Sequence, residues 1–439
     1  MEINKIYQGN CLDTMKTFLD NSIDAIVTDP PYGLSFMGKK WDYDVPSQEI
    51  WTECLRILKP GGYLLSFAGT RTQHRMACNI EDAGFEIRDM IAWVYGSGFP
   101  KSLNVGKAVD KLQGNEREVI GYEPQFPDGT RGATYRGQAS KDNNLKFTSK
   151  DTSTAGLKPI YKKNNEWEGW GTALKPALEP ITVARKPLSE KTVAENVLKW
   201  GTGGINIDGC RVEVNETEKN KYLHQDLSES NSEATVDFGC SNHKRNGGNE
   251  QGRFPANVIH DGSDEVVDLF PDTKSGKYQK QSRKRKGFML SGSEDNIQEA
   301  NAPDNYGDSG SASRFFYCAK ASKSERNRGC EGLEEKQTVG GGGGIGDYLD
   351  DVNSASGKYG SEKAPAKNNH PTVKPIALME YLVKLVSREG AVVLDPFAGS
   401  GSTLIACKNL KRNYIGCELD EEYIKIAEAR LKDKQKRLL

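Results

Sequence analysis

The chain has 439 residues, which is long enough for a catalytic domain and a second module. Lysine and arginine together number 60 and aspartate and glutamate 61, so the net charge by itself indicates no nucleic-acid partner. No run of eighteen apolar residues and no signal-peptide pattern occur, so we expect a soluble, intracellular protein with no membrane partner. The nine cysteines include no Cys-x-x-Cys pair, which indicates reduced thiols and argues against a structural zinc site.

The first hundred residues alternate short apolar runs with amphipathic ones. Ile23 to Val27 and Tyr63 to Phe67 predict buried strands. Between them, Ile50 to Leu58 predicts a helix that ends at Lys59-Pro60-Gly61-Gly62. Phe85 to Val94 predicts the next strand. This βαβ order predicts an α/β fold with a parallel sheet.

The middle of the chain has weaker signals. Lys101 to Gly171 is polar with little periodicity, which predicts long loops or a mobile insertion. Ile181 to Ala184 is typical of a strand. From Ser189 to Lys367 aromatic fragments alternate with polar runs, and Gly340 to Gly344 form a glycine string. We interpret this range as a loop-rich module that ends in a flexible linker.

Basic residues gather in two places, Lys277 to Lys286 and the tail from Arg430 to Arg437. Such runs are often only a solvated loop or a frayed helix end. In a protein of nearly zero net charge, they are also the candidate contacts for a phosphate backbone.

Strong α/β signals return after Asn368. The expected elements are a helix from Ile376 to Val386, a strand from Ala391 to Leu394, a helix from Ser402 to Asn409, a strand from Tyr414 to Glu418 and a last helix that Asp420 opens.

Two predicted strands end in a carboxylate and a tight loop. Asp29-Pro30-Pro31-Tyr32 follows the first, and Asp395-Pro396-Phe397-Ala398-Gly399-Ser400-Gly401 follows the strand at Ala391. Ligands bind at the carboxyl ends of strands in open parallel sheets, so both motifs can line one crevice if their strands belong to one sheet.

The glycine loop predicts a nucleotide-like ligand. Glycine lets backbone N–H groups approach a ligand closely, and Glu418 lies at the distance where an acidic residue can bind ribose hydroxyls. Spacing alone leaves a dinucleotide and S-adenosylmethionine open, whereas a phosphate-binding P-loop is excluded because no Gly-Lys-Ser/Thr follows.

These motifs resemble those of the S-adenosylmethionine-dependent DNA amino-methyltransferases, which methylate an exocyclic amine of adenine or cytosine. Because the catalytic motif comes first, the chain is similar to the circularly permuted beta group. The resemblance covers the first hundred residues, about 172 to 187, and everything from about Asn368 onward. It implies a Rossmann-like class I methyltransferase sheet, mostly parallel with helices on both faces, and an inserted loop-rich target-recognition module.

The resemblance also implies a division of the chain. The expected parts are a catalytic half at 1–100, a polar insertion near the substrate face at 101–171, a core strand at 172–188, the target-recognition module with its linker at 189–367, and the S-adenosylmethionine-binding half at 368–439. Within the module, Arg253, Arg314 and Lys323 are candidate base contacts by chemistry alone.

The implied catalytic residues are Asp29, Pro30, Pro31 and Tyr32. An exocyclic amine is a poor nucleophile because its lone pair is delocalised into the ring. A site that accepts hydrogen bonds from both of its N–H groups, at the Asp29 carboxylate and the Pro30 carbonyl, makes the nitrogen more tetrahedral. Tyr32 would stack on a base flipped out of the duplex, and Gly33 to Asp44, with Trp41, would form a closing loop.

The implied cofactor is S-adenosyl-L-methionine, whose sulfonium carries its own positive charge, so no metal is needed. Asn369 to Pro375 resembles the segment that closes over the cofactor, and Gly9-Asn10-Cys11-Leu12 resembles the turn near its adenine ring, with Asn10 in place of the usual aspartate. The implied cofactor-binding residues are Asn10, Cys11, Asp29, His370, Thr372, Lys374, Asp395, Phe397, Ala398, Gly399, Ser400, Gly401, Ser402, Thr403, Glu418 and Leu419.

The resemblance therefore implies a site-specific adenine-N6 methyltransferase that acts on double-stranded DNA in the cytoplasm of a bacterial cell or phage-infected host. Cytosine-N4 methylation, a catalytically inactive DNA-binding subunit, and an RNA or protein substrate are the alternatives. The family allows a homodimer and a cognate restriction enzyme. Leu178 stands where the family's corresponding strand frequently has histidine.

Overall fold

The computed structural model describes residues 1–34, 42–98, 102–124, 157–161, 165–213, 252–274, 309–319, 325–338 and 363–433. The chain forms two compact units. The main unit consists of Met1–Gly98, Ala177–Val339 and Glu362–Leu439, and the smaller unit of Phe99–Pro176 and Gly340–Ser361. Among the described residues, no helix has the length and apolar character needed to cross a bilayer.

Within the described residues, the main unit is built around one nine-stranded sheet. In spatial order its strands are β1 (Lys5–Gln8), β15 (Asn413–Glu418), β14 (Val392–Asp395), β2 (Ile23–Thr28), β3 (Leu58–Phe67), β7 (Leu178–Arg185), β4 (Glu86–Val94), β8 (Val258–His260) and β11 (Tyr317–Cys318). All neighbouring strands are parallel except where β7 pairs with β3 and β4. The predicted mostly parallel, Rossmann-like sheet is confirmed.

Helices cover both faces of this sheet. They are α1 (Cys11–Met15), α2 (Gln48–Ile57), α3 (Gln73–Asp82), α6 (Val193–Trp200), α9 (Ile376–Val386), α10 (Ser402–Asn409) and α11 (Glu421–Lys432); the short helix α8 (Asp264–Val267) follows β8 along the chain. Successive side chains of a strand point to opposite faces. Accordingly, Ala25 and Val27 share a core cluster with Leu382 of α9, whereas Ile26 packs with Trp51 of α2.

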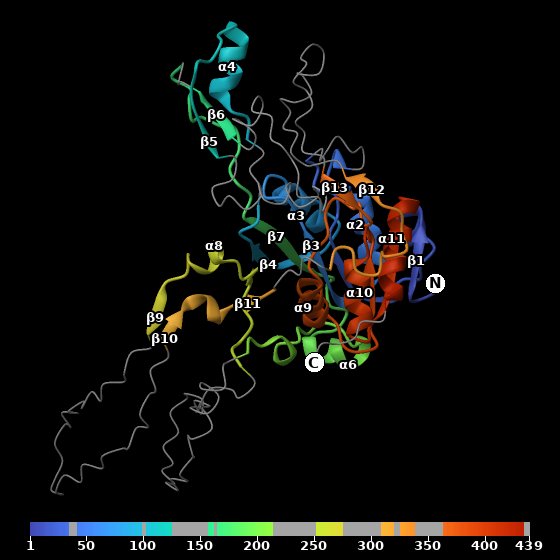
Figure 1. Cartoon of the computed structure of the whole chain (residues 1–439). Coiled ribbons are helices and arrows are strands. Elements are labelled where there is room, and N and C mark those ends of the chain that lie inside the picture. Colours follow the sequence, from blue (N-terminus) through green and yellow to red (C-terminus); the bar gives the residue numbers. More distant parts are fainter. Residues whose placement is uncertain are drawn as a thin grey trace, which may run out of the picture. The chain divides into compact units, whose positions relative to one another are not determined.

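The two ends of the chain meet in the main unit. Figure 1 shows the red C-terminal helix α11 beside the blue strand β1, and β1 pairs in parallel with β15. The catalytic half at 1–100 and the half at 368–439 therefore contribute strands to one sheet.

Most predicted elements of the two ends are confirmed, and the helices Ile376–Val386 and Ser402–Asn409 have the predicted bounds. The strand predicted from Tyr63 starts earlier, at Leu58, directly after α2. Leu58 already has extended backbone angles and pairs with Ile23, while Gly61, with φ +76°, absorbs the irregular register that follows. The Pro-Gly-Gly run ends the helix but does not delay the strand.

Strand β7 runs against its neighbours, and this reversal matters for the site. Phe67 at the carboxyl end of β3 is opposite Ile181, so the first residues of β7 lie at the edge where the parallel strands end. Glu179 thus reaches the edge at which ligands bind in sheets of this kind.

The expectation of loops throughout 101–171 is wrong for part of that range. The smaller unit contains α4 (Val105–Gln113) and an antiparallel pair, β5 (Val119–Pro124) with β6 (Leu157–Tyr161). Asn104 caps the start of α4 by accepting from the Lys107 amide, and Gly114 closes it with φ +69°. The N-cap Asn104 and the C-terminal Gly114 are ordinary helix signals, but the polar composition of the range led to a prediction of loops.

The range 189–367 also contributes to the main sheet, through β8 and β11. Its other described strands form two antiparallel pairs, β9 (Asp272–Lys274) with β10 (Ser309–Ser311) and β12 (Lys336–Thr338) with β13 (Lys363–Ala366). Strands of two to four residues are too short to give a periodic pattern, which is why the sequence predicted loops here.

Candidate active site

The two motifs meet where β14 and β2 lie side by side. Val393 is opposite Ala25 and Leu394 opposite Ile26, so both strands end at the same edge. The chain leaves β14 toward β15 and leaves β2 toward β3, which makes this pair the point where the strand order reverses. The Thr28 hydroxyl donates to Asp395 Oδ1 over 2.7 Å and ties the two strand ends together. The condition that both strands belong to one sheet and end at the same edge is therefore met.

The Asp-Pro-Pro-Tyr turn is shaped by a buried aspartate that the sequence analysis did not single out. Asp42 Oδ1 accepts from the backbone N–H of Tyr32 (2.7 Å) and of Gly33 (3.0 Å), and Oδ2 from that of Leu34 (3.3 Å). Three amides converge on one carboxylate, so the turn has a fixed shape. Trp41 of the predicted closing loop lies outside the described residues.

Four side chains form a hydrogen-bonded group at this edge, which we call the Lys374 cluster: Asp29, Tyr32, Glu179 and Lys374. Asp29 Oδ1 accepts from the Tyr32 hydroxyl (2.6 Å) and Oδ2 from Lys374 Nζ (2.7 Å). Lys374 Nζ also lies 3.1 Å from Tyr32 Oη and 3.1 Å from Glu179 Oε2. Lys374 is one of the residues that the resemblance assigns to the cofactor, and its ammonium contacts the catalytic candidates Asp29 and Tyr32.

Burial and charge fix the protonation of this cluster. Burial alone would lower the pKa of Lys374, but the charges of Asp29 and Glu179 outweigh it and raise that pKa, so Lys374 stays a cation. Burial and the same two carboxylates raise the pKa of Tyr32 well above 10, so it stays a phenol. The ammonium lies 5.4 Å from the centre of the Tyr32 ring and 4.9 Å from that of Phe67, within cation–π range.

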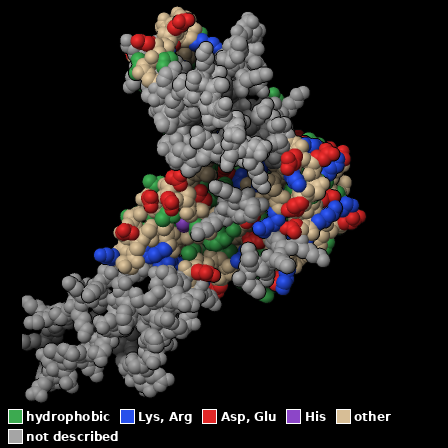
Figure 2. Space-filling view, in the orientation of Figure 1, with side chains coloured by type: hydrophobic (Ala, Val, Ile, Leu, Met, Phe, Trp, Pro, Cys, Tyr) green, Lys and Arg blue, Asp and Glu red, His purple; other side chains and the backbone are tan. Residues whose placement is uncertain are grey.

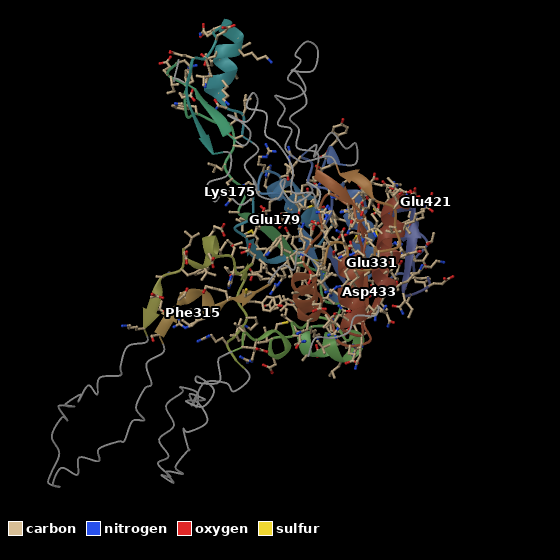
Figure 3. The ribbon with its side chains drawn as sticks, in the orientation of Figure 1. Lys175, Glu179, Phe315, Glu331, Glu421 and Asp433 are labelled. Atoms are coloured by element: carbon tan, nitrogen blue, oxygen red, sulfur yellow. The ribbon has the colours of Figure 1, made fainter. Side chains whose placement is uncertain are left out.

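Glu179 is the functional candidate that sequence reasoning missed. It lies at the start of β7 (labelled in Figure 3), and its Oε2 is 3.0 Å from Tyr32 Oη. Burial and the charge of Glu179 raise the pKa of the nearby Tyr95 to about 12. Glu179 precedes the predicted strand, Ile181 to Ala184, by two residues, and its only sequence signal was an acidic side chain just before an apolar run.

The predicted cofactor loop follows β14 and begins α10. Gly399 (φ +50°) and Gly401 (φ +78°) have backbone angles that favour glycine. A Cβ on Gly401 would lie 2.9 Å from the Ala427 Cβ, so the loop also needs a small residue there. Ser400, Ser402 and Thr403 of this loop are buried.

Glu418, at the end of β15, closes the other side of this loop. Its Oε2 accepts from the Gly399 amide (2.7 Å) and its Oε1 from the Asp420 amide (2.9 Å). Burial raises the pKa of this carboxyl. Each oxygen keeps a second lone pair for a ligand hydroxyl.

The remaining residues assigned to the cofactor differ in position. The Phe397 amide donates to Asp395 Oδ1 (3.1 Å), and its ring packs beside a core cluster. Ala398 is buried in the core, whereas Leu419 is 66% exposed. The structure brings Asp395 through Thr403 together with Glu418, and leaves the Leu419 side chain at the surface.

Asn10 and Cys11 lie next to Glu418, because the Gly9 amide donates to the Glu418 carbonyl over 2.9 Å. The Asn10 side-chain oxygen caps α1 by accepting from the Leu12 amide (2.8 Å). Cys11 is buried, which raises the pKa of its thiol to about 11.

His370 faces the glycine loop. A Cβ on Gly399 would lie 2.7 Å from His370 Nε2, so only glycine leaves room for this ring. Burial lowers the pKa of His370 to about 4, and its Nδ1 pairs with the Thr372 carbonyl. The neutral ring therefore has its proton on Nδ1 and presents the Nε2 lone pair to the loop. Thr372 takes part through its backbone, and its side chain is exposed.

The half-buried Arg326 and the buried Arg430 support these segments. Arg326 donates to the backbone carbonyls of Asn368 and His370. Arg430 of α11 is 5% exposed and donates to Ser400 O (2.6 Å), Ser400 Oγ (2.9 Å) and Ser402 Oγ (3.3 Å). The interpretation of Arg430 as part of a basic tail is wrong, because its guanidinium lies inside the protein beneath the loop.

The two arginines proposed as base contacts, Arg253 and Arg314, form hydrogen bonds within the protein. Arg314 donates to the carbonyls of Gly310 and Ser311 and to Thr273 Oγ1, which joins β9 to β10. Arg253 donates to the Arg314 carbonyl (3.0 Å). Both guanidinium groups lie within 5 Å of the Phe315 ring centre, at 4.8 and 4.4 Å. Lys323 and the basic run from Lys277 to Lys286 lie outside the described residues.

Charge is mixed on the visible surface. On the face shown in Figure 2, lysine and arginine side chains alternate with aspartate and glutamate over the right-hand part of the main unit. Among the described residues, no group of three or more His, Cys, Asp and Glu side chains could hold a metal ion.

Comparison with known proteins gives a family match over most of the chain. A family model described as DNA methylase matches residues 23–429. Curated relatives match short segments: the type II methyltransferase M.HpaI of Haemophilus parainfluenzae is 50% identical over 62 residues, and M.HindIII of Haemophilus influenzae is 49% identical over 65 residues. These segments are 14% and 15% of this chain and only 20% and 21% of the relatives' own length.

Solved structures of low sequence identity also align. The M1.HpyAVI–SAM complex has 15% identity and a TM-score of 0.38, over 98% of this chain and 99% of that one. The cytosine-N4-specific PvuII DNA methyltransferase has 13% identity and a TM-score of 0.40, over 99% and 88%.

The buried Asp395 makes stability depend on pH. Burial raises its pKa from the usual 3.8 to about 6, so between these values the folded state binds more protons than the unfolded state. As pH rises through this window, ionisation of Asp395 lowers the free energy of unfolding by at most about 3 kcal/mol. We expect the unfolding temperature of Asp395→Asn, relative to wild type, to be higher at pH 7 than at pH 4 in thermal denaturation. If the unfolding temperatures of variant and wild type differed by the same amount at pH 7 and pH 4, the raised pKa of Asp395 would be wrong.

Arg430 should control the glycine loop. Arg430→Met removes the hydrogen bonds to Ser400 and Ser402, and charge-assisted bonds of this kind contribute roughly 1.5–3 kcal/mol each. We expect at least a tenfold loss of affinity for S-adenosylmethionine, the ligand that the sequence predicts, in titration calorimetry. Lys432→Met on the same helix, whose side chain is 80% exposed, is the matched control and should bind normally. Equal affinities for the two variants would show that Arg430 does not support the loop.

Proposed function

The chain belongs to the S-adenosylmethionine-dependent DNA amino-methyltransferases, the family whose model matches residues 23–429, and on that basis we propose that it methylates the N6 amine of adenine in duplex DNA. The methyl donor is S-adenosylmethionine, which supplies an electrophilic methyl group on a sulfonium. One observation carries the proposal: the Asp29 carboxylate lies at the strand edge that also holds the glycine loop, joined through Thr28 and Asp395.

The residues present fit this cofactor. A Cβ on Gly399 would meet His370 and one on Gly401 would meet Ala427, so both positions need glycine, the residue that allows the closest approach to the backbone. Glu418 keeps lone pairs for ribose hydroxyls at the end of the next strand. His370 presents an acceptor nitrogen toward the same loop.

The Asp29 turn is suited to an amine nucleophile. Asp29 and the Pro30 carbonyl accept from the two N–H groups of the amine, which makes its lone pair available without removing a proton beforehand. Asp42 fixes the turn, and the prolines fix φ on either side of the Pro30 carbonyl. Tyr32, which is partly buried beside the core, offers an aromatic face to a base that has left the stack.

Adenine is favoured over cytosine by Asp29, since cytosine-N4 relatives more often have serine at this place. Cytosine-N4 methylation is the alternative. The presence of both Asp29 and Glu418 favours an active enzyme over a DNA-binding subunit without activity. Action on DNA would place the protein in the cytoplasm of a bacterial or phage-infected cell, with a homodimer and a cognate restriction enzyme as proposed partners.

Product analysis tests the substrate. The full-length protein is incubated with duplex DNA and labelled S-adenosylmethionine, and the DNA is digested to nucleosides. We expect labelled N6-methyl-2′-deoxyadenosine. Labelled N4-methyl-2′-deoxycytidine would replace the proposal with its alternative, and label recovered only in an RNA or protein competitor would exclude a DNA substrate.

Substitution of Asp29 tests the catalytic group. Asp29→Ala removes one acceptor for the amine, and removal of one such preorganised group costs roughly a hundredfold or more in turnover. We expect kcat to fall by this factor while titration calorimetry shows nearly unchanged cofactor affinity. Asp13→Ala, which removes an exposed carboxylate on α1, is the control and should keep wild-type turnover. Undiminished activity of Asp29→Ala would disprove the role of this carboxylate.

A further inference from the structure

The Tyr32 hydroxyl has more acceptors than it can serve. It lies 2.6 Å from Asp29 Oδ1 and 3.0 Å from Glu179 Oε2, and it has one proton. It therefore donates fully to one carboxylate at a time, and the shorter distance gives that bond to Asp29. Glu179 is the second acceptor, already within hydrogen-bonding distance.

Lys374 has the same two partners. Its Nζ is 2.7 Å from Asp29 Oδ2 and 3.1 Å from Glu179 Oε2, again closer to Asp29. The lysine side chain is 7% exposed, so water cannot readily replace either partner. The ammonium must remain with these carboxylates wherever it moves.

Each oxygen of Asp29 therefore already accepts one hydrogen bond and has one lone pair left. Tyr32 donates to one and Lys374 to the other, and each donor weakens the oxygen as an acceptor for a third group. An amine that donates to Asp29 competes with these bonds. The competition is relieved if both donors can pass to another carboxylate without loss of a hydrogen bond.

We propose that Glu179 is a positioning residue that takes over the Tyr32 hydroxyl and the Lys374 ammonium when the target amine donates to Asp29. This inference rests on the proposed function. The movement needed is small, because both donors are already within 3.1 Å of Glu179 Oε2. Glu179 acts through Asp29 and does not touch the reacting atoms.

The charge of the cluster makes the exchange specific. Two carboxylates and one ammonium give the cluster a single negative charge. Glu179→Gln leaves Lys374 with Asp29 as its one carboxylate partner in the cluster, which strengthens the contact that the amine must displace. Removing Lys374 as well restores the single negative charge and releases Asp29.

The first measurement uses the free protein and does not depend on activity. The ¹⁵N signal of the Lys374 ammonium is assigned by its loss in Lys374→Met. We expect Glu179→Gln to shift this signal. Glu86→Gln, which removes a carboxylate of β4 paired with Arg185, is the matched control and should leave it in place. An unshifted signal in Glu179→Gln would refute the sharing of Lys374.

The second measurement is turnover with saturating cofactor. We expect Glu179→Gln to lower kcat on DNA by roughly a hundredfold, the loss that a misplaced catalytic group can cause, with unchanged cofactor affinity. The double variant Glu179→Gln/Lys374→Met should recover part of this loss, whereas Glu86→Gln should keep wild-type kcat. If Glu179 had a purely structural role, removal of the buried Lys374 as well would not be expected to restore kcat.

The outcomes separate the two proposals. If wild-type protein methylates DNA but Glu179→Gln is as active as Glu86→Gln, or if the two substitutions lower kcat additively, the role of Glu179 is wrong. If wild-type protein methylates no DNA, the proposed function is wrong, and the ammonium signal still decides whether Glu179 and Asp29 share Lys374.

Discussion

The parallel pairing of β14 with β2 is the constraint on which the rest of the structure depends. These strands are separated by most of the chain, yet their carboxyl ends are joined by the bond from Thr28 to Asp395. Because side chains alternate along a strand, a shift of one residue in this register would turn Asp395 away from Thr28. The pairing therefore brings the Asp29 turn and the glycine loop to one edge.

Several charged groups at this edge are buried, which is costly in free energy. Burial raises the pKa of Asp395 and Glu418 and lowers that of Arg430 to about 10. Buried charges are tolerated when they are paired or hydrogen-bonded, and perturbed groups concentrate at functional sites. The pattern is consistent with stability given up locally for a site with a fixed arrangement of donors and acceptors.

The site is held by residues from distant parts of the chain. Asp42 shapes the turn after Asp29, Arg326 supports the segment with His370, and Arg430 supports the glycine loop. Glu179 arrives on the reversed strand β7, whose direction places its first residues at the ligand edge. Each of these side chains contacts backbone atoms or, in the case of Glu179, the charged side chain of Lys374.

The sequence by itself determined the strands at Ile23 and Ala391, the helices α9 and α10, and the residues that follow the two strands. Apolar runs, glycines and caps are local signals, and each follows from the conformational preferences of a few neighbouring residues. Only the tertiary structure decided that Lys374 contacts Asp29, that Glu179 joins them, and that Arg430 lies beneath Ser400. Those contacts join residues far apart in the chain, so their existence depends on strand order and register, which no local pattern encodes.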